Sequence, residues 1–163
     1  MHAQNILAFT LVSVILILEV LTTLPMNNPN GIIFIDDNPQ DVSLVKYAIS
    51  QIDTPVQFTS YESGKAFIDD LENLYAPSIA CLLIDINMPL MDGFEVLKTI
   101  RNHNDFEFTP AIIFSSTNSY EEKAKAYQSG ANGYVSKPQD IEDIVKAMQS
   151  IVDFWVATNE RTL

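Results

Sequence analysis

The chain has 163 residues, which is enough for one domain with a full hydrophobic core and argues against two. Its 21 acidic and 9 basic residues give a formal net charge of −12, which argues against binding to nucleic acid because the phosphates would be repelled. Cys81 is the only cysteine, so an intrachain disulfide is excluded, and His2 and His103 lack the spacing of metal ligands.

The first 25 residues differ in composition from the rest. Residues 6–24 are almost wholly apolar, and a helix of this length can just cross a bilayer of about 30 Å. Glu19 interrupts the run, and no Lys or Arg precedes Lys46, so the segment lacks the basic start of a secretory signal and a charge bias that would orient a span. Three hypotheses stay open for residues 1–25: a membrane anchor, a signal sequence, or a mis-assigned start codon upstream of Met26.

After a short polar lead over residues 26–30, apolar runs that end in polar residues follow in regular order. Residues 32–35 predict a buried strand that ends at Asp36-Asp37. Asn38 then predicts a helix N-cap, and Asp41 favours the positive end of the helix dipole. The helix is expected to bury one apolar face, which is formed by Val42, Val45, Ile49 and Ile52.

A second strand is expected near residues 55–60, followed by a helix that turns Phe67, Leu71 and Leu74 inward. The next apolar run, residues 79–84, is typical of a strand buried on both faces of a parallel sheet, and it ends at Asp85. A sharp turn through Pro89 and Gly93 leads into a helix in which three apolar residues recur: Phe94, Leu97 and Ile100.

The last third of the chain repeats this alternation. Residues 111–114 predict a strand that ends at Ser115, and Ser119 with Glu122 predicts a capping box at the start of the following helix, which Gly130 closes. Residues 133–136 predict a last strand that stops at Lys137-Pro138. The final helix should bury a face formed by Ile141, Ile144, Val145, Met148, Ile151, Val152 and Trp155.

Five alternating strands and helices predict an α/β fold, a doubly wound five-stranded parallel sheet covered by helices on both faces. If the strand order is 2-1-3-4-5, the strand ends converge beside the switch point of the sheet. Three carboxylates, a hydroxyl and an ammonium would then share one site: Asp36, Asp37, Asp85, Ser115 and Lys137.

This set of groups indicates phosphoryl transfer to a carboxylate. Three carboxylates held close together repel one another, and Mg²⁺ is the natural compensating ion because it accepts oxygen ligands and leaves room for phosphate. Asp85 would attack phosphorus, while Lys137 neutralises the phosphoryl oxygens and Ser115 donates to one of them. Taken one at a time, each acid is more simply a helix cap or a strand end; the convergence of four strand ends favours the shared site.

Residues 31–157 resemble the receiver domain of two-component response regulators, a flavodoxin-like (CheY-like) fold, with a tail over residues 158–163. The resemblance rests on Asp36-Asp37, on Asp85-Ile86-Asn87-Met88-Pro89 with Asp92-Gly93, on Ser115, and on Gly130-Ala131-Asn132-Gly133-Tyr134 before Lys137-Pro138. The Asp-Asn-Pro-x-Asp start and Phe154-Trp155 are similar to the stand-alone subgroup that serves phytochrome-type and hybrid sensor kinases. The family lacks the apolar segment 1–25, and this chain lacks a DNA-binding output domain.

The resemblance assigns roles to individual residues. Asp85 is implied to be the phospho-acceptor and a Mg²⁺ ligand, with Asp37 binding the ion directly and Asp36 directly or through water. The backbone carbonyl of Asn87 is implied as a further ligand. Lys137 is implied to pair with the acyl phosphate, and the Lys137–Pro138 bond is implied to be cis, which would aim the lysine into the site.

Ser115 and Tyr134 are implied to form the conformational switch, in which the hydroxyl moves to the phosphoryl group and the aromatic ring turns inward. For Tyr134, the plain alternative is a half-buried strand aromatic. The partners implied are a sensor histidine kinase or histidine phosphotransfer protein, and an unknown downstream protein that binds through the last two helices and the last strand. A cytoplasmic domain is expected, anchored to a membrane only if residues 6–24 are a real anchor.

Two other functions stay open. A pseudo-receiver would keep the fold as an unphosphorylated docking module. A small Mg²⁺-dependent aspartyl phosphatase would need a second acid two residues after its nucleophile, where this chain has Asn87, which cannot transfer protons. We therefore expect no enzymatic turnover beyond slow hydrolysis of the chain's own acyl phosphate, influenced by Asn87 and Thr117.

Overall fold

The computed structural model describes residues 29–160. The hypotheses on residues 1–25 and most of the polar lead therefore lie outside the described residues, as do the last three residues of the tail, 161–163. Within residues 29–160, no helix combines the length and the apolar character needed to span a membrane.

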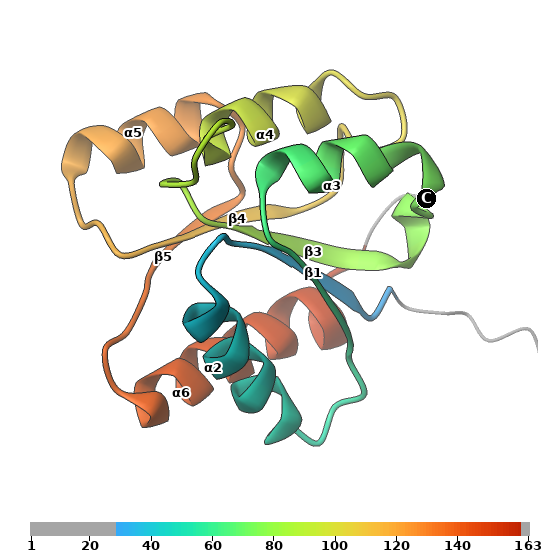
Figure 1. Cartoon of the computed structure of the whole chain (residues 1–163). Helices are drawn as coiled ribbons and strands as arrows, with labels where there is room; N and C mark the ends of the chain where they lie inside the picture. Colours follow the sequence, from blue (N-terminus) through green and yellow to red (C-terminus); the bar gives the residue numbers. More distant parts are fainter. Residues whose placement is uncertain (1–28, 161–163) are drawn as a thin grey trace, which may run out of the picture.

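Five parallel strands form one sheet with the order β2-β1-β3-β4-β5 (Figure 1). The strands are β1 (Gly31–Ile35), β2 (Gln57–Tyr61), β3 (Ile79–Ile84), β4 (Ala111–Ser115) and β5 (Gly133–Ser136). All four neighbouring pairs run parallel. The predicted doubly wound sheet and its strand order are confirmed, and every strand was predicted to within two residues at its ends.

Helices cover both faces of this sheet. Figure 1 shows α3 (Gly64–Asp70), α4 (Gly93–Arg101) and α5 (Tyr120–Gln128) on one face, and α2 (Pro39–Ser50) and α6 (Ile141–Ile151) on the other. Short 3-10 turns, η1 (Leu71–Asn73) and η2 (Ala76–Ser78), lead into β3. Leu71 and Leu74 were expected on the second helix, but they follow its last α-helical residue, and the chain tightens there into the 3-10 turn.

Two hydrophobic cores lie on the two faces of the sheet. Alternate residues of β1 and β3 face opposite cores, as the two-residue period of a strand requires. Ile33 and Leu82 pack under α3, α4 and α5, whereas Phe34 and Leu83 pack under α2 and α6. Because the central strands are buried along their whole length, their ends are held rigidly at the carboxyl edge of the sheet.

Side-chain caps start the helices that follow β1 and β4. The Asn38 side chain accepts a hydrogen bond from the backbone N–H of Gln40, which confirms the predicted N-cap of α2. Ser119 caps α5 by accepting from the N–H of Glu122, but the predicted reciprocal bond is absent, because the N–H of Ser119 donates to the hydroxyl of Thr117 at 3.2 Å. The full capping box lies instead at α4, between Asp92 and Glu95.

The last helix changes its winding. After α6 the chain continues as a π-helix, η3 (Val152–Thr158), in which each turn is wider than in an α-helix. The predicted apolar face is correct as far as Val152. Beyond that point Val156 takes the buried position and Trp155 is only half-buried, because the wider turn places a residue above the one five positions earlier.

Candidate functional site

Two buried carboxylates stand at the carboxyl edge of the sheet. Asp36 follows β1 with 1% of its surface exposed, and Asp85 follows β3 with 4% exposed. The N–H of Asp36 donates to the carbonyl of Tyr61, and the N–H of Asp85 donates to the carbonyl of Ile35. Both residues therefore extend the backbone ladder of the sheet, which fixes the position from which each carboxylate projects.

One ammonium joins these carboxylates. Lys137, which follows β5, places its Nζ 2.7 Å from Oδ2 of Asp36, 2.8 Å from Oδ2 of Asp41 and 2.9 Å from Oδ1 of Asp85. Its own N–H donates to the carbonyl of Ser115 at 2.8 Å, which ties the end of β5 to the end of β4. Residues from three strand ends and the first turn of α2 thus meet at one ammonium.

Each strand-end carboxylate is also held by the loop that follows it. Oδ1 of Asp36 accepts from the N–H of Asn38, and Oδ2 of Asp85 accepts from the N–H of Asn87, both at 2.8 Å. In each case one oxygen faces the backbone and the other faces Lys137. Each carboxylate is therefore held in one orientation by the protein itself.

Burial and the neighbouring opposite charges shift the pKa values of Asp36 and Lys137 in opposite directions. Burial raises the pKa of the Asp36 carboxyl, and the hydrogen bond and charge of Lys137 only partly offset this effect. Burial lowers the pKa of Lys137, but its hydrogen bonds to three carboxylates outweigh burial and raise that pKa above its ordinary value. The two directions are compatible, since three carboxylates share one ammonium and the acids are less well compensated than the base.

The loop after β3 passes very close to the helix that follows it. The N–H of Gly93 donates to the carbonyl of Ile86 at 3.0 Å, and a Cβ at Gly93 would lie 2.2 Å from the backbone oxygen of Asp85. Only glycine fits such a close approach. The predicted turn therefore fixes the backbone that carries Asp85 and Asn87.

The two proposed switch residues meet at Thr117. Ser115 is fully buried, and its hydroxyl accepts from the N–H of Thr117 at 3.5 Å. The hydroxyl of Tyr134 donates to the carbonyl of Thr117 at 3.1 Å. Tyr134 is half-buried, and burial raises the pKa of its phenol. The segment after β4 thus links the residue at the site to the aromatic ring on β5.

The structure brings Asp36, Asp85 and Lys137 together but not Asp37. The Asp37 side chain is exposed, and no hydrogen bond or ion pair within residues 29–160 involves its carboxylate. In that same range no three acidic, histidine or cysteine side chains already surround a single metal position. The oxygen donors that are present, two buried carboxylates and the nearby backbone carbonyls, are nevertheless of the type that suits Mg²⁺.

Asp41 is a site residue that the sequence reasoning interpreted as a favourable charge at the helix dipole and as part of the Asp-Asn-Pro-x-Asp start, with no role at the site. Its carboxylate contacts Lys137 at 2.8 Å, although the two residues are 96 positions apart. The signal that could have found it is its place in the first turn of α2, directly after the strand that ends at Asp36. Here the first turn of α2 directs Asp41 back toward that edge, where it meets Lys137.

The predicted cis peptide bond before Pro138 is wrong, since no peptide bond within residues 29–160 is cis. The trans form is the more stable one even before proline. It also suffices here, because the long side chain of Lys137 reaches Asp36 and Asp85 from a trans backbone.

Comparisons with known proteins identify the family and the fold. The family described as "Response regulator receiver domain" matches residues 32–149. Response regulator Rcp1 of Synechocystis sp. is 26% identical over 138 residues, which cover 81% of this chain and 92% of Rcp1.

Two solved structures share the fold. The Mn²⁺-bound form of Rcp1 has a TM-score of 0.73 at 24% identity, with 83% of this chain and 100% of that chain covered. The response regulator RPA3017, described in red light signaling of R. palustris, has a TM-score of 0.73 at 25% identity, with coverage of 82% and 99%.

Proposed function

Because the chain belongs to the response regulator receiver domain family, we propose that Asp85 accepts a phosphoryl group from a phosphohistidine. The donor would be a sensor histidine kinase of the phytochrome or hybrid type, or a histidine phosphotransfer protein. The observation that carries the proposal is the 2.9 Å contact between Lys137 Nζ and Oδ1 of the buried Asp85. A carboxylate with a fixed cation beside it is already arranged to receive a charged phosphoryl group.

The proposed step transfers one phosphoryl group without a further reactant. An oxygen of the Asp85 carboxylate attacks phosphorus, and the P–N bond to the donor imidazole breaks. The electron pair of that bond stays on the imidazole nitrogen, so the products are an acyl phosphate on Asp85 and a free histidine. Lys137 keeps its charge through the step, because its raised pKa lies far above neutral pH, and it neutralises the phosphoryl oxygens.

Asp36, Asp37, Asp85 and the backbone carbonyl of Asn87 are the residues that would hold Mg²⁺. Bound there, Mg²⁺ supplies charge neutralisation at the phosphoryl oxygens. The chain's own contribution is to hold two carboxylates in place through the N–H groups of Asn38 and Asn87. Lys137 now occupies part of the space between the acids, so ion binding and the Lys137 contacts with Asp36 are expected to compete.

Ser115 and Tyr134 would transmit phosphorylation to the surface. Ser115 can donate its hydroxyl to a phosphoryl oxygen, which would draw the segment around Thr117 toward the site and release the bond from Tyr134. The surface biased in this way includes α5, β5 and α6, where Tyr120 and Tyr127 are exposed. A downstream protein would bind there in one of the two states.

The chain would act as a phosphoprotein rather than an enzyme. Asn87 stands two positions after the acceptor, and its amide cannot act as a general acid or base, so only slow hydrolysis of the acyl phosphate on Asp85 is expected. The domain would work in the cytoplasm, where phosphoryl groups derived from ATP are available. Should residues 6–24 be a membrane anchor, residues 29–160 would face that compartment.

The test is incubation of the full chain with Mg²⁺ and acetyl phosphate, followed by intact-mass measurement. We expect a gain of one phosphoryl group, which alkaline hydroxylamine removes because it cleaves acyl phosphates. Asp85→Asn should remain unlabelled, whereas Asp53→Asn, a change at an exposed acid, should be labelled like the parent chain. Equal labelling of Asp85→Asn would refute the assignment, and no labelling at all would favour a docking pseudo-receiver.

A further inference from the structure

A groove runs between α4 and α5, which lie side by side on one face of the sheet (Figure 1). It consists of two adjoining cavities of about 360 Å³ and 470 Å³, whose walls share Asp92, Phe94 and Lys125. Its floor is apolar, because Ile86 and Met88 are buried in the first cavity together with Phe94. We call this feature the α4–α5 groove, and Asn87, a residue of the sheet-edge site, lines it.

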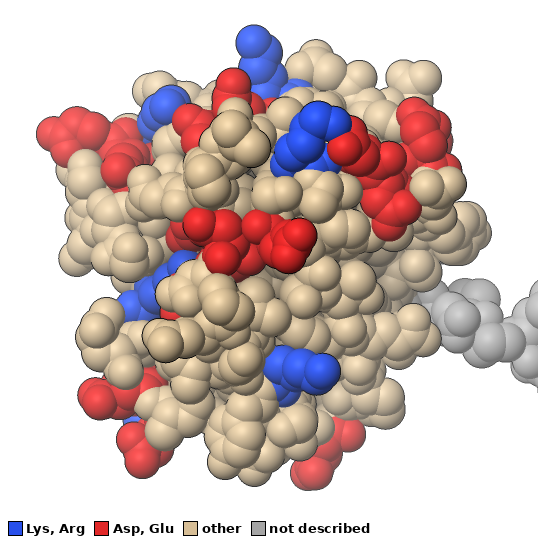
Figure 2. All heavy atoms as spheres, viewed as in Figure 1, with Lys and Arg blue, Asp and Glu red and all other residues tan. Residues whose placement is uncertain are grey.

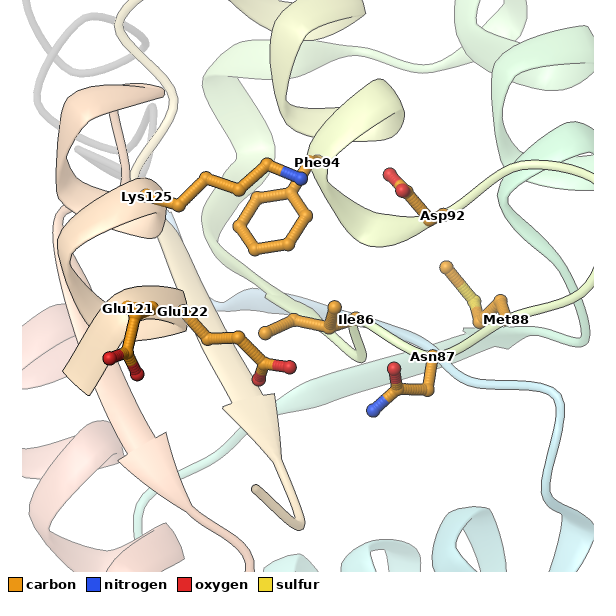
Figure 3. Close-up of a pocket in the computed structure, with 8 residues that line it drawn as sticks. All are labelled: Ile86, Asn87, Met88, Asp92, Phe94, Glu121, Glu122 and Lys125. Carbon is orange, nitrogen blue, oxygen red and sulfur yellow. The ribbon is translucent and has the colours of Figure 1, made fainter. Parts of the chain in front are cut away.

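The end of the groove nearest the sheet edge is acidic. Figure 3 shows the Glu122 carboxylate pointing across the cavity toward Ile86 and Asn87. Oε2 of Glu122 is buried and has no hydrogen-bond partner within residues 29–160. The other acids here are engaged: Asp92 accepts from the N–H of Glu95, and Glu121 accepts from the hydroxyl of Ser119. Glu122 is thus the acceptor that lacks a donor, and a cationic side chain would supply one.

The other end of the groove has three basic and two acidic side chains. Asp92 and Glu95 line the second cavity, but each of these carboxylates is engaged in the capping box of α4. The three cations of this cavity are Lys98, Arg101 and Lys125. None of the three forms an ion pair with a carboxylate among the described residues. Lys125 lies 3.8 Å above the ring of Phe94, a cation–π contact that holds its ammonium over the groove. Arg101 already donates to the backbone carbonyls of neighbouring loops, so of these three cations Lys98 and Lys125 are left for a negative group.

We propose that the α4–α5 groove binds a short segment of a partner protein that carries an arginine or lysine at one end and an aspartate or glutamate at the other. The basic side chain would pair with Glu122 and the acidic one with Lys98. Lys98 lies within α4, whose nine residues rise about 13 Å, so a segment of about five extended residues is long enough to reach along the groove past Lys98. Charge complementarity at both ends and an apolar floor between them define this partner.

A peptide bound in the groove would contact Asn87, which holds the Asp85 carboxylate at the sheet edge. Asn87 lines the acidic cavity, and its N–H donates to Oδ2 of Asp85. Binding itself needs no phosphoryl group, so the proposal can be tested, and can fail, independently of phosphorylation of Asp85.

The experiment titrates the full, unphosphorylated chain with the peptide acetyl-Arg-Ala-Ala-Ala-Asp-amide while amide shifts are followed by NMR. We expect saturable shifts at the amides of Asn87, Phe94 and Lys125. A peptide with alanine in place of both charged residues should cause no saturable shift. The proposal is overturned if the charged peptide does not saturate, or if its shifts map to the α2 and α6 face of the sheet.

Variants locate the two ends of the bound peptide. Glu122→Gln and Lys98→Glu should each weaken binding about fivefold, the factor expected for one partly exposed ion pair. A peptide with arginine at both ends should regain affinity for Lys98→Glu, because the charge reversal is then matched. The control is Lys46→Glu, at an exposed cation on α2, which should leave the affinity of the Arg-to-Asp peptide unchanged. Failure of the rescue, or an equal loss in the control, would refute docking in the groove.

Discussion

At the scale of single residues, one ammonium is shared by three carboxylates. Lys137 contacts Asp36, Asp41 and Asp85, so the four groups together carry a formal charge of −2. Lys137 is 11% exposed at its side chain, and the two strand-end acids are more deeply buried. Solvent therefore screens these charges little, and the cluster depends on the lysine for its compensation.

Replacement of this lysine should destabilise the fold in the absence of Mg²⁺. Lys137→Met leaves Asp36 and Asp85 buried without a cation, and removal of one partner from a buried ion pair costs about 3 kcal/mol. Urea unfolding in the presence of a chelator measures this loss. Lys146→Met is the control, because its ion pair with Asp143 is exposed and should contribute less than about 1 kcal/mol. Equal losses in the two variants would contradict the assigned role of Lys137.

The phenol of Tyr61 should respond to pH in a distinct window. Burial and a 2.6 Å hydrogen bond to Asp70 raise its pKa from 10.0 to about 12. The folded state therefore keeps this proton longer than the unfolded state, and the stability that results is present below pH 10 and lost as the pH rises toward 12. An ultraviolet titration of tyrosinate should show that Tyr61 and Tyr134 ionise late, and Tyr61→Phe should remove the transition near pH 12. The control is Tyr75→Phe, a change at an exposed ring, in which the transition near pH 12 should remain. If that transition also remained in Tyr61→Phe, another tyrosine would be responsible for it.

At the scale of elements, the connections at the ends of strands and helices determine where the functional groups lie. The capping box of Asp92 and Glu95 starts α4, and Gly93 lies against the backbone of Asp85. Arg101, at the end of α4, donates from its guanidinium to the carbonyls of Phe106, Glu107, Thr109 and Gly130 and to the side chain of Asn132. Burial lowers the pKa of Arg101. The two ends of α4 thus hold different loops in place.

Substitution of Gly93 should disturb the site more than the helix. Alanine normally favours a helix over glycine by about 1 kcal/mol, but a Cβ here would lie 2.2 Å from the Asp85 carbonyl oxygen. We expect Gly93→Ala to lower the free energy of unfolding by about 2 kcal/mol and to impair labelling by acetyl phosphate. Gly133→Ala is the control, because the nearest atoms to its Cβ are 3.6 Å away. Full labelling of Gly93→Ala would show that this backbone contact is not needed.

At the scale of the whole molecule, charge is distributed unevenly. Figure 2 shows acidic side chains gathered across the middle of the face that it displays, between the two helix layers. The chain's net charge of −12 opposes compaction by self-repulsion, and the cluster at the sheet edge concentrates part of that charge in a buried place. A divalent cation bound at the sheet edge would reduce both the overall self-repulsion and the repulsion between the buried carboxylates.

Mg²⁺ should therefore stabilise the folded chain. At one hundred times its dissociation constant, a ligand that binds only the folded state adds about 2.7 kcal/mol to the free energy of unfolding. Thermal or urea unfolding with increasing Mg²⁺ measures the gain, with NaCl at matched ionic strength as the control for screening. The gain should be strongly reduced in Asp85→Asn. An equal gain from NaCl would mean that Mg²⁺ acts as a general counterion and not at the site.

The sequence by itself determined the strands and their alternation with helices, which predicts a parallel sheet. It also determined the acids and the lysine that follow the strand ends. Those features are local, because a buried strand is read from an apolar run and a strand end from the first polar residue after it. Only the tertiary structure decided which acids share Lys137: it brought in Asp41 and left Asp37 exposed. Lys137 and Asp36 are 101 positions apart, and which side chains meet over that separation depends on how the helices pack and not on any local pattern. The π-helical segment after α6 and the α4–α5 groove likewise follow from no local pattern, whereas the trans bond before Pro138 is the ordinary preference of peptide bonds.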